Sequence, residues 1–223
     1  MCMAVKYPRL TVDPLVFAFF DGKLQLLLSV RENEPQKGEF AIPGGHSYAD
    51  QTTLDAIAYA LQQKTVVSMT DLSYIEQMYF FDTQNVDPRG HAVTLSFLCL
   101  VRPDVGLRSL QQGALWVDAH NVPKLAFDHI SIVERALSEL KQKLLTTTLG
   151  QFLLPEECRL NDICRLYEAV FARSFDNRNF RKKFLSFDVL TDTEKKEQGV
   201  ANRPSKLYKF TEKRLVYLYE LKL

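Results

Sequence analysis

The sequence predicts an α/β (α+β) chain of two domains: a mixed-sheet α/β/α sandwich, then a smaller domain of two helices and a β-hairpin. Strand-like apolar runs alternate with two helical stripes up to residue 145, residues 146–150 break the last stripe, and a helix-turn-helix pattern then starts afresh. The 223 residues, 46% hydrophobic and 25% charged, suffice for one large or two small globular domains. We place the first domain at residues 1–148 and the second at residues 149–223.

The first domain is predicted to begin with a β-hairpin. Residues 10–20 and 23–30 are apolar runs, and residues 21–22 between them are Asp-Gly. This arrangement predicts a hairpin, because a type I′ turn needs a positive φ at both central positions. Residues 31–39 form a polar loop after it.

A glycine pair and an amphipathic helix are predicted next. Residues 40–42 form a short strand, and Gly44 and Gly45 after Pro43 allow a tight backbone turn. The helix is predicted over residues 50–65, because four apolar residues recur at helical spacing: Leu54, Ile57, Ala58 and Leu61.

Three more strands and a second helix complete the first domain. The strands are predicted at residues 74–81, 91–101 and 114–117. The helix is predicted over residues 129–145 with Asp128 as its N-cap, and its buried stripe consists of Ile130, Val133, Leu137, Leu140 and Leu144. Strands interleaved with two helices predict the α/β sandwich.

The second domain starts after a linker. Residues 146–150, Thr-Thr-Thr-Leu-Gly, are unsuited to continuing the helix. An amphipathic helix capped by Asn161 is predicted next, because five apolar residues recur at helical spacing: Leu160, Ile163, Leu166, Tyr167 and Val170.

A short basic helix and a hairpin follow. The helix is predicted at residues 177–184, where Phe180 and Phe184 lie four apart and can anchor it to the preceding helix. Residues 189–210 are predicted to form two strands around a charged loop, residues 192–204. Helix, turn, helix and β-hairpin is the order of a winged helix-turn-helix domain.

Charge is divided unevenly between the two domains. Residues 1–150 carry 13 Lys and Arg against 16 Asp and Glu, whereas residues 151–223 carry 15 against 11. The excess is largest in residues 173–214, with 12 basic against 6 acidic side chains. Such a local excess suits the neutralisation of nucleic-acid phosphates, although a solvated lysine-rich surface would give the same count.

The glycine pair and its helix resemble the Nudix box, whose pattern is Gly, five residues, Glu, seven residues, Arg-Glu, apolar, any, Glu-Glu, any, Gly, apolar. When the first Gly of the pattern is aligned with Gly45, the sequence also matches it at Leu61 and Val67. The other defined positions carry Gln51, Tyr59, Ala60, Gln63, Lys64 and Val66. Because the glutamates of the hydrolases bind Mg²⁺, we expect no metal site, no catalytic residue and no enzyme activity here, but a sensor of the same substrate class.

The resemblance extends over almost the whole chain. Five stretches carry it in order: residues 40–45, 74–77, 87–90, 125–129, and 166–169 together with 176–183. The sequence resembles the Nudix-related transcriptional regulators, bacterial proteins in which a Nudix-like domain precedes a winged-helix DNA-binding domain. The resemblance implies a homodimer that binds palindromic operator DNA. In one branch such proteins repress NAD-biosynthesis genes and are released by ADP-ribose, and in another branch the effector is arabinose.

The candidate effector site combines the glycine turn with arginines that suit a pyrophosphate and an aromatic ring that suits a base. We expect ADP-ribose or a close relative to bind, with a neutral pentose as the alternative. The candidate effector-binding residues are Arg31, Phe40, Gly44, Gly45, His46, Gln77, Asp87, Arg89 and His129. We expect no cofactor.

The candidate DNA-binding residues lie on the basic helix and the hairpin. They are Asn177, Arg178, Asn179, Arg181, Lys182, Lys183, Lys195, Lys196, Arg203, Lys206 and Tyr208. Arg178 and Asn179 suit base edges, since Arg pairs with guanine and Asn with adenine in the major groove. The lysines suit phosphates. An alternative for Asn179 is that it braces its own helix.

The remaining features exclude several classes of protein. Cys2, Cys99, Cys158 and Cys164 show no CxxC spacing, so we expect reduced thiols and no zinc. The longest apolar run, residues 15–20, is too short to span a membrane, and we expect a cytoplasmic protein. An active Nudix hydrolase with a protein-interaction tail remains the competing hypothesis.

Overall fold

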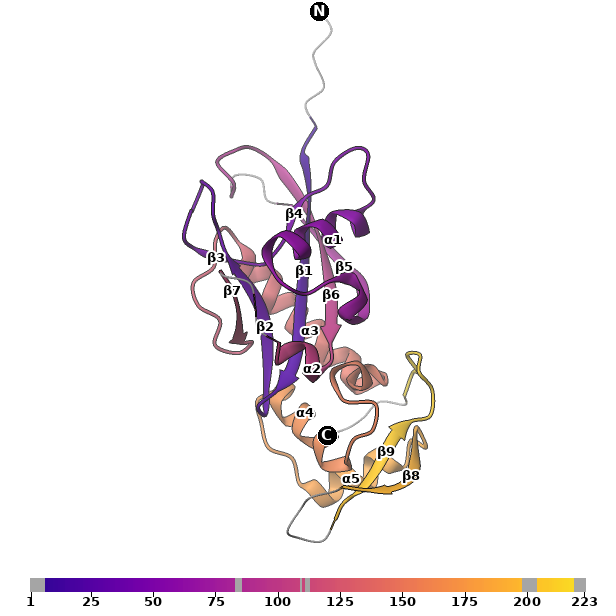
Figure 1. The fold of residues 1–223 in the computed structure, drawn as a ribbon. Helices are drawn as coiled ribbons and strands as arrows, with labels where there is room; N and C mark the ends of the chain where they lie inside the picture. The colour runs from indigo at the N-terminus through magenta and orange to yellow at the C-terminus, as the bar shows by residue number, and fades with distance from the viewer. Residues whose placement is uncertain (1–6, 83–85, 109, 111–112, 198–203, 219–223) are drawn as a thin grey trace, which may run out of the picture.

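The computed structural model describes residues 7–82, 86–108, 110, 113–197 and 204–218. Its main feature is a mixed sheet whose central path runs β3-β2-β1-β6-β5 (Figure 1). The strands are β1 (Arg9–Phe20), β2 (Lys23–Val30), β3 (Phe40–Ala41), β4 (Gly45–His46), β5 (Leu72–Asp82), β6 (Ala92–Val101) and β7 (Ala114–Asp118). β1 and β6 are parallel, and the other pairs, including β4 with β1 and β7 with β2, are antiparallel.

The predicted opening hairpin is confirmed. Asp21 and Gly22 have φ values of 52° and 72°, as a type I′ turn requires. The turn sets the register of β1 against β2, in which Phe20 lies opposite Lys23 and Phe17 opposite Leu26.

Helices cover both faces of the sheet, as predicted. Alternate β1 residues point to opposite faces: Leu15 and Phe17 pack in the cluster with α3 (His129–Thr146), and Val16 and Ala18 pack in the cluster with α1 (Thr53–Lys64). α1 begins at the N-cap Thr52, whose hydroxyl accepts a hydrogen bond from the backbone N–H of Asp55.

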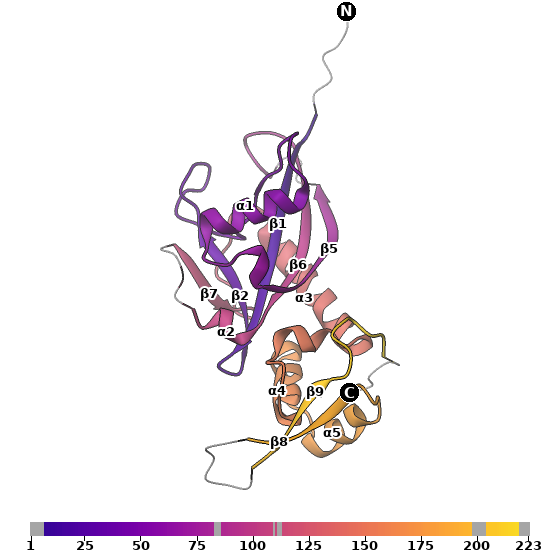
Figure 2. The same ribbon diagram turned by 45° about the vertical axis from the view of Figure 1, so that its right-hand side comes forward.

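The C-terminal elements have the predicted winged-helix order (Figure 2). They are α4 (Leu160–Phe171), α5 (Asn177–Leu185), β8 (Leu190–Lys196) and β9 (Lys206–Phe210). Phe180 and Phe184 are 3% and 1% exposed, and their rings lie 5.2 and 5.8 Å from the ring of Tyr167 on α4. The prediction that these two rings anchor the basic helix is therefore confirmed.

The two predicted domains share one hydrophobic core. The cluster around α3 continues through Leu149 and Leu153 to Leu166 and Tyr167 of α4. The Tyr167 hydroxyl donates a hydrogen bond of 2.7 Å to the carbonyl oxygen of Leu144.

The segment expected to be a linker is buried at this junction. Thr147 and Thr148 are 2% and 3% exposed, and the 3-10 helix η2 (Leu149–Leu153) follows at once. The chain returns there after β9, because the N–H of Thr148 bonds the carbonyl of Val216 (2.9 Å) and the N–H of Leu218 bonds that of Thr146 (2.7 Å).

Several local predictions were wrong. Asn161 is not the N-cap of α4, because Arg159 precedes the helix and its backbone N–H donates to the carboxylate of Asp162. Ile130 is 41% exposed, and the buried stripe of α3 uses Ile132 and Ala136 as well as three predicted residues.

Other boundaries and short elements also differ from the sequence prediction. Asp128 occupies the N-cap position of α3 but makes no side-chain cap bond there. β8 extends to Lys196, so the charged loop is shorter than predicted. β4, η2 and two further short helices, η1 (Met69–Asp71) and α2 (Pro103–Gly106), were not predicted.

Candidate functional site

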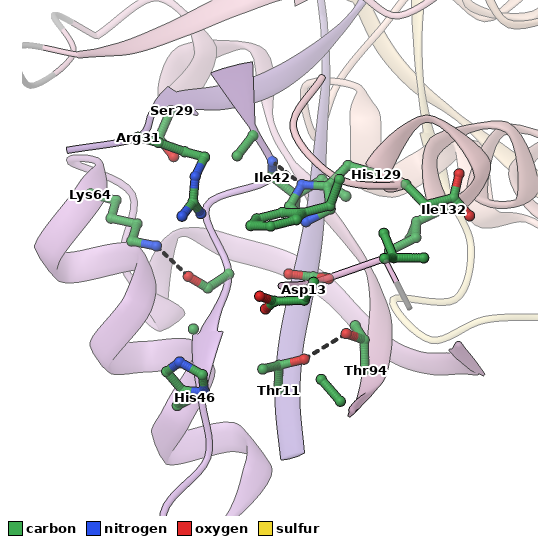
Figure 3. A pocket seen from close by; sticks show the side chains of 18 of the residues that line it. Thr11, Asp13, Ser29, Arg31, Ile42, His46, Lys64, Thr94, His129 and Ile132 are labelled. Carbon is green, nitrogen blue, oxygen red and sulfur yellow. Dashed lines mark hydrogen bonds between the residues drawn. The ribbon is translucent and has the colours of Figure 1, made fainter. Parts of the chain in front are cut away.

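A cavity of about 310 Å³ lies at one end of the sheet, where β1, the glycine turn and the start of α3 meet (Figure 3). β1 contributes Thr11 and Asp13, and the C-terminal end of α1 contributes Lys64. The cavity is also lined by seven of the nine predicted effector-binding residues, Arg31, Gly44, Gly45, His46, Asp87, Arg89 and His129. Residues from six separate parts of the sequence therefore converge on one space.

Phe40 and Gln77 do not line this cavity. Phe40 packs against the hydrophobic core, and Gln77 is exposed on β5, opposite Phe97 of β6. The cavity has a different aromatic side chain, Phe127, in the loop before α3. One sequence signal points to Phe127, because it lies inside one of the stretches that match the family.

Phe127 lies against the two predicted arginines. The guanidinium carbon of Arg31 is 4.6 Å and that of Arg89 5.7 Å from the centre of the ring. The Arg31 side chain also donates hydrogen bonds to the carbonyls of Pro35 (2.9 Å) and Asn33 (3.3 Å). These contacts hold Arg31 at the edge of the cavity.

Arg89 is held on the predicted β-turn. The turn is closed by a bond of 3.0 Å from the N–H of Gly90 to the carbonyl of Asp87, whose carboxylate accepts bonds from the side chains of Arg89 (2.8 Å) and Arg9 (3.0 Å). Burial acts to raise the pKa of Asp87, but the hydrogen bonds from Arg89 and Arg9 outweigh it and hold that pKa well below its usual value. Asp87 therefore positions the arginine as an ionised carboxylate.

Gly44 is needed because of a close approach. A Cβ added there would lie 1.9 Å from Oδ1 of Asp13 and 2.3 Å from the carbonyl oxygen of Val12, whereas one added at Gly45 would meet Ala60 at 3.4 Å. Any side chain at Gly44 would therefore displace the turn from its position against β1.

Two buried ionisable groups form part of the cavity wall. Burial raises the pKa of Asp13 to about 7, although the charge of Lys64 opposes the shift. Burial, with Arg31 and Lys64 adding to it, lowers the pKa of His129 to about 4. His129 is therefore neutral at pH 7, and because its Nδ1 accepts a bond of 3.1 Å from the N–H of Ile42, its Nε2 carries the proton. The sequence analysis missed Asp13, whose only signal is an acid inside an apolar run.

The basic face of α5 is the second candidate site. Asp176 caps the helix by accepting a bond of 2.7 Å from the backbone N–H of Asn179, and Asn177 donates to Asn161 of α4 at 2.8 Å. The cap bond uses the backbone of Asn179, and within the described residues its side chain makes no hydrogen bond that would brace the helix. The predicted residues Asn177, Arg178, Asn179, Arg181, Lys182 and Lys183 are all exposed.

The predicted DNA-binding residues of the hairpin have different environments. The three lysines among them are all exposed. Lys195 forms an ion pair with Glu157 (2.7 Å) and Lys206 with Asp192 (2.6 Å), whereas Lys196 forms none with the described residues. Tyr208 is half-buried and packs against the core, so only part of its side chain is accessible for the predicted DNA contact. Arg203 lies outside the described residues.

The described residues hold neither a metal-binding cluster nor a membrane-spanning helix. Within the described part of the chain, no group of three or more His, Cys, Asp or Glu side chains could hold a metal ion. No helix among the same residues is long and apolar enough to cross a membrane.

Comparisons with known proteins agree with this architecture. A family model described as the NrtR DNA-binding winged helix domain matches residues 150–210. The chain is 30% identical over 209 residues to the ADPR-responsive transcriptional repressor NtrR of Acinetobacter baylyi, covering 91% of this chain and 82% of that protein.

Two solved structures are similar to the chain. Shewanella oneidensis NrtR complexed with a 27mer DNA matches with a TM-score of 0.75 at 28% identity, over 91% of this chain and 93% of that one. The Nudix domain of the same protein complexed with ADP ribose matches with a TM-score of 0.54 at 29% identity, over 61% and 90%. The chain therefore belongs to the NrtR family of Nudix-related transcriptional regulators.

Proposed function

We propose that this protein is a transcriptional repressor that binds operator DNA through its winged helix and is released by ADP-ribose, or a related nucleotide, bound in the cavity. The observation that carries the proposal is the joint presence of a cavity lined by Arg31, Arg89 and Lys64 and an exposed basic helix on one chain. The similarity to a repressor responsive to ADPR supports it. In this proposal the protein represses NAD-metabolism genes in the cytoplasm. It binds a palindromic operator as a homodimer.

The cavity chemistry favours a nucleotide over a neutral sugar. Three cationic side chains suit the two negative charges of a pyrophosphate, and Phe127 offers a ring face to a base or ribose. A pentose such as arabinose would need hydrogen-bonding amides and acids more than three cations. Calorimetric titration with ADP-ribose, NAD and arabinose tests this choice, and binding of arabinose without binding of ADP-ribose would reverse it.

The residues at the box positions support sensing rather than hydrolysis. The side chains there are an amide, a methyl, a second amide and an ammonium at Gln51, Ala60, Gln63 and Lys64. The competing hypothesis has support of its own, since a Methanocaldococcus jannaschii ADP-ribose pyrophosphatase is 28% identical over 129 residues. Mg²⁺-dependent release of AMP from ADP-ribose, with a turnover on the order of 1 per second or more, would exclude the sensor hypothesis.

The proposed coupling between the two sites passes through the shared core. α3 carries His129 at the cavity and Leu144 at the contact with Tyr167 of α4. A ligand can release DNA only by as much as its affinity differs between two arrangements, about 1–3 kcal/mol or roughly 5- to 150-fold. If saturating ADP-ribose leaves operator affinity unchanged in a mobility-shift titration, that coupling does not exist.

The DNA-binding residues should divide into two groups. Arg178 near the start of α5 is proposed to read a base edge, and Lys196 of the wing to contact phosphate. Arg178→Ala should weaken cognate operator binding by about 1–3 kcal/mol with little effect on random DNA, whereas Lys196→Ala should weaken both and reduce the salt slope by about one unit. Equal losses on operator and scrambled duplex for Arg178→Ala would remove it from the base-reading group.

A further inference from the structure

Lys64 occupies an unexpected place in the cavity. It is the last residue of α1 and stands where the Nudix box has a metal-binding glutamate. Figure 3 shows its side chain directed at the glycine turn, where its Nζ donates a hydrogen bond of 2.5 Å to the carbonyl oxygen of Gly44. The helix end and the turn together fix the position of this ammonium group.

The residues around Lys64 do not fit a divalent metal. Mg²⁺ requires several oxygen ligands, and carboxylates supply most of them in proteins. Five acids line the cavity: Asp13, Glu32, Asp82, Asp87 and Asp128. Asp87 is bonded to Arg89 and Arg9, and Asp13 is buried beside the positive charge of Lys64. Among the described side chains no acidic cluster of the required size exists.

Lys64 instead lies among other charged side chains of the cavity. Burial lowers the pKa of Lys64, the charge of Asp13 opposes this, and the neighbouring charges of Arg31 and Arg89 lower the pKa further. Arg31 and Arg89 oppose the charged form of Lys64. Asp13 favours it more strongly than Arg31 opposes it, and Glu32 more strongly than Arg89. An anion placed beside Lys64 would favour its charged form further.

We propose that the Lys64 ammonium group supplies the positive charge that a divalent metal would otherwise supply opposite the effector's pyrophosphate, so that this chain binds its effector without metal. The inference rests on the proposed function and assigns Lys64 to the effector site. Gly44 shares in the role, because its carbonyl oxygen holds the ammonium group in place. Arg31 and Arg89, which line the same cavity, then contact the same anion.

Calorimetric titration of the full chain with ADP-ribose tests the proposal. Wild-type affinity should be the same within about twofold in EDTA and in Mg²⁺. Lys64→Met keeps the length of the side chain but removes its charge, and it should weaken binding by about 10- to 100-fold, the size expected for a hydrogen bond to a charged group. Lys64→Arg should recover most of the loss.

Lys23→Met is the matched control, because Lys23 is an exposed lysine of the same domain that does not line the cavity. Its affinity for ADP-ribose should equal that of the wild type. The thermal unfolding midpoint of Lys64→Met without ligand shows whether the variant is folded. A folded Lys64→Met variant with wild-type affinity would overturn the proposal.

Paramagnetic resonance of Mn²⁺ tests directly whether the metal remains on the effector when the protein binds it. Mn²⁺ binds ADP-ribose in solution, and the amplitude of its paramagnetic resonance signal reports the free ion. If the protein takes the effector without metal, adding wild-type protein to the mixture should raise the free Mn²⁺ signal. A fall in the signal, or affinity that requires Mg²⁺, would overturn the role of Lys64 alone, whereas no binding of ADP-ribose in either buffer would overturn the proposed effector as well.

Discussion

The cavity and the basic helix hold their positive charges in opposite ways. In the cavity, Arg31 is bonded to the carbonyl of Pro35, Arg89 to Asp87 and Lys64 to the carbonyl of Gly44. On α5, within the described part of the chain, Arg178, Arg181 and Lys182 are exposed and make no side-chain hydrogen bond or ion pair.

This difference matches the two kinds of partner that we propose. A small ligand gains affinity when the groups around it are fixed in advance, because less conformational entropy is lost on binding. A DNA backbone presents many phosphates along its length, and long mobile side chains on a protein surface can each find one. The fold therefore fixes the charges of the cavity and leaves those of the helix free.

The largest expected effect comes from a substitution in the core of the winged helix. It should abolish binding of DNA by the basic helix but leave the cavity intact. Phe184 is 1% exposed and packs against the rings of Tyr167, Phe180 and Phe210. Phe184→Ala should destabilise the C-terminal domain by about 3–5 kcal/mol. Operator binding in a mobility-shift assay should be lost, while calorimetric affinity for ADP-ribose should stay within a few-fold.

Leu185→Ala is the control for this experiment, since Leu185 is 44% exposed on the same helix. It should leave both binding activities intact. Because the two domains share one core, the alternative outcome is informative: if Phe184→Ala abolishes binding of ADP-ribose too, the regions fold as one unit and the comparison above does not hold.

The second prediction concerns the cavity alone and uses the opposite pKa shifts of Asp13 and His129. Asp13 has its pKa raised from 3.8 to about 7, so its contribution to stability is present below pH 4 and is lost as the pH rises through about 7. His129 has its pKa lowered from 6.5 to about 4, so its contribution is present above pH 6.5 and is lost as the pH falls through about 4.

The two contributions offset each other in the wild type between pH 4 and 7. Asp13→Asn should therefore make stability rise with pH over this window, and His129→Gln should make it fall, each by about 2–4 kcal/mol relative to wild type. Urea denaturation from pH 4 to pH 8 measures both slopes. Parallel pH curves for the three proteins would show that these groups do not titrate as the burial of the cavity requires.

The third prediction tests how closely the glycine turn must approach β1. Gly44→Ala would place its methyl group 1.9 Å from Asp13 Oδ1, so the turn must move, at a cost of about 1–3 kcal/mol. Calorimetry should show loss of binding to ADP-ribose, with operator binding retained. Gly45→Ala, whose new methyl group would lie 3.4 Å from Ala60, should bind ADP-ribose nearly as well as the wild type. Equal affinities for the two variants would contradict the assigned role of Gly44.

Most of the fold could be predicted from the sequence, because its signals are local. The Asp21-Gly22 turn and the apolar stripes of α4 and α5 each reflect a short-range preference that the tertiary structure keeps. The predicted stripe of α1 was only partly right, because Leu54 is 46% exposed, and Ala56 and Ala60 are buried beside Ile57 and Leu61. The errors arose where tertiary packing decides. The buried face of α3 depends on where the sheet lies, so periodicity alone wrongly included Ile130.

The candidate cavity was only partly predictable for the same reason. Arg89 could be identified because it lies in a recognisable turn, and Arg31 because the family resemblance places it beside the ligand; both line the cavity. Phe127 and Asp13 reach the cavity only because a loop and a central strand meet there, and no local pattern encodes that meeting. Lys64 was identified as a departure from a motif, but its contact with Gly44 required the structure.

The smallest expected effect concerns the β8–β9 hairpin, where one proposed DNA-binding lysine is paired with an acid, unlike the cations of α5, which form no ion pair with the described residues. Lys195 pairs with Glu157 at 2.7 Å, and its side chain is 64% exposed. Exposed pairs of this kind contribute about 0.2–1 kcal/mol. Glu157→Gln should release Lys195 to contact phosphate, which tightens binding less than about tenfold and steepens the salt dependence by up to about one unit.

The neighbouring Glu156 provides the control for this last prediction, because it pairs with Lys213, which is outside the proposed DNA-binding set. Glu156→Gln removes the same negative charge from the adjacent position, so it reports the general effect of net charge on DNA affinity. Mobility-shift titrations of both variants across a salt series, on operator and on scrambled duplex, give the two slopes. Only Glu157→Gln should steepen the slope. If both variants tighten binding equally, the carboxylate of Glu157 does not compete with DNA for Lys195, and the wing lysine is as available as those of α5.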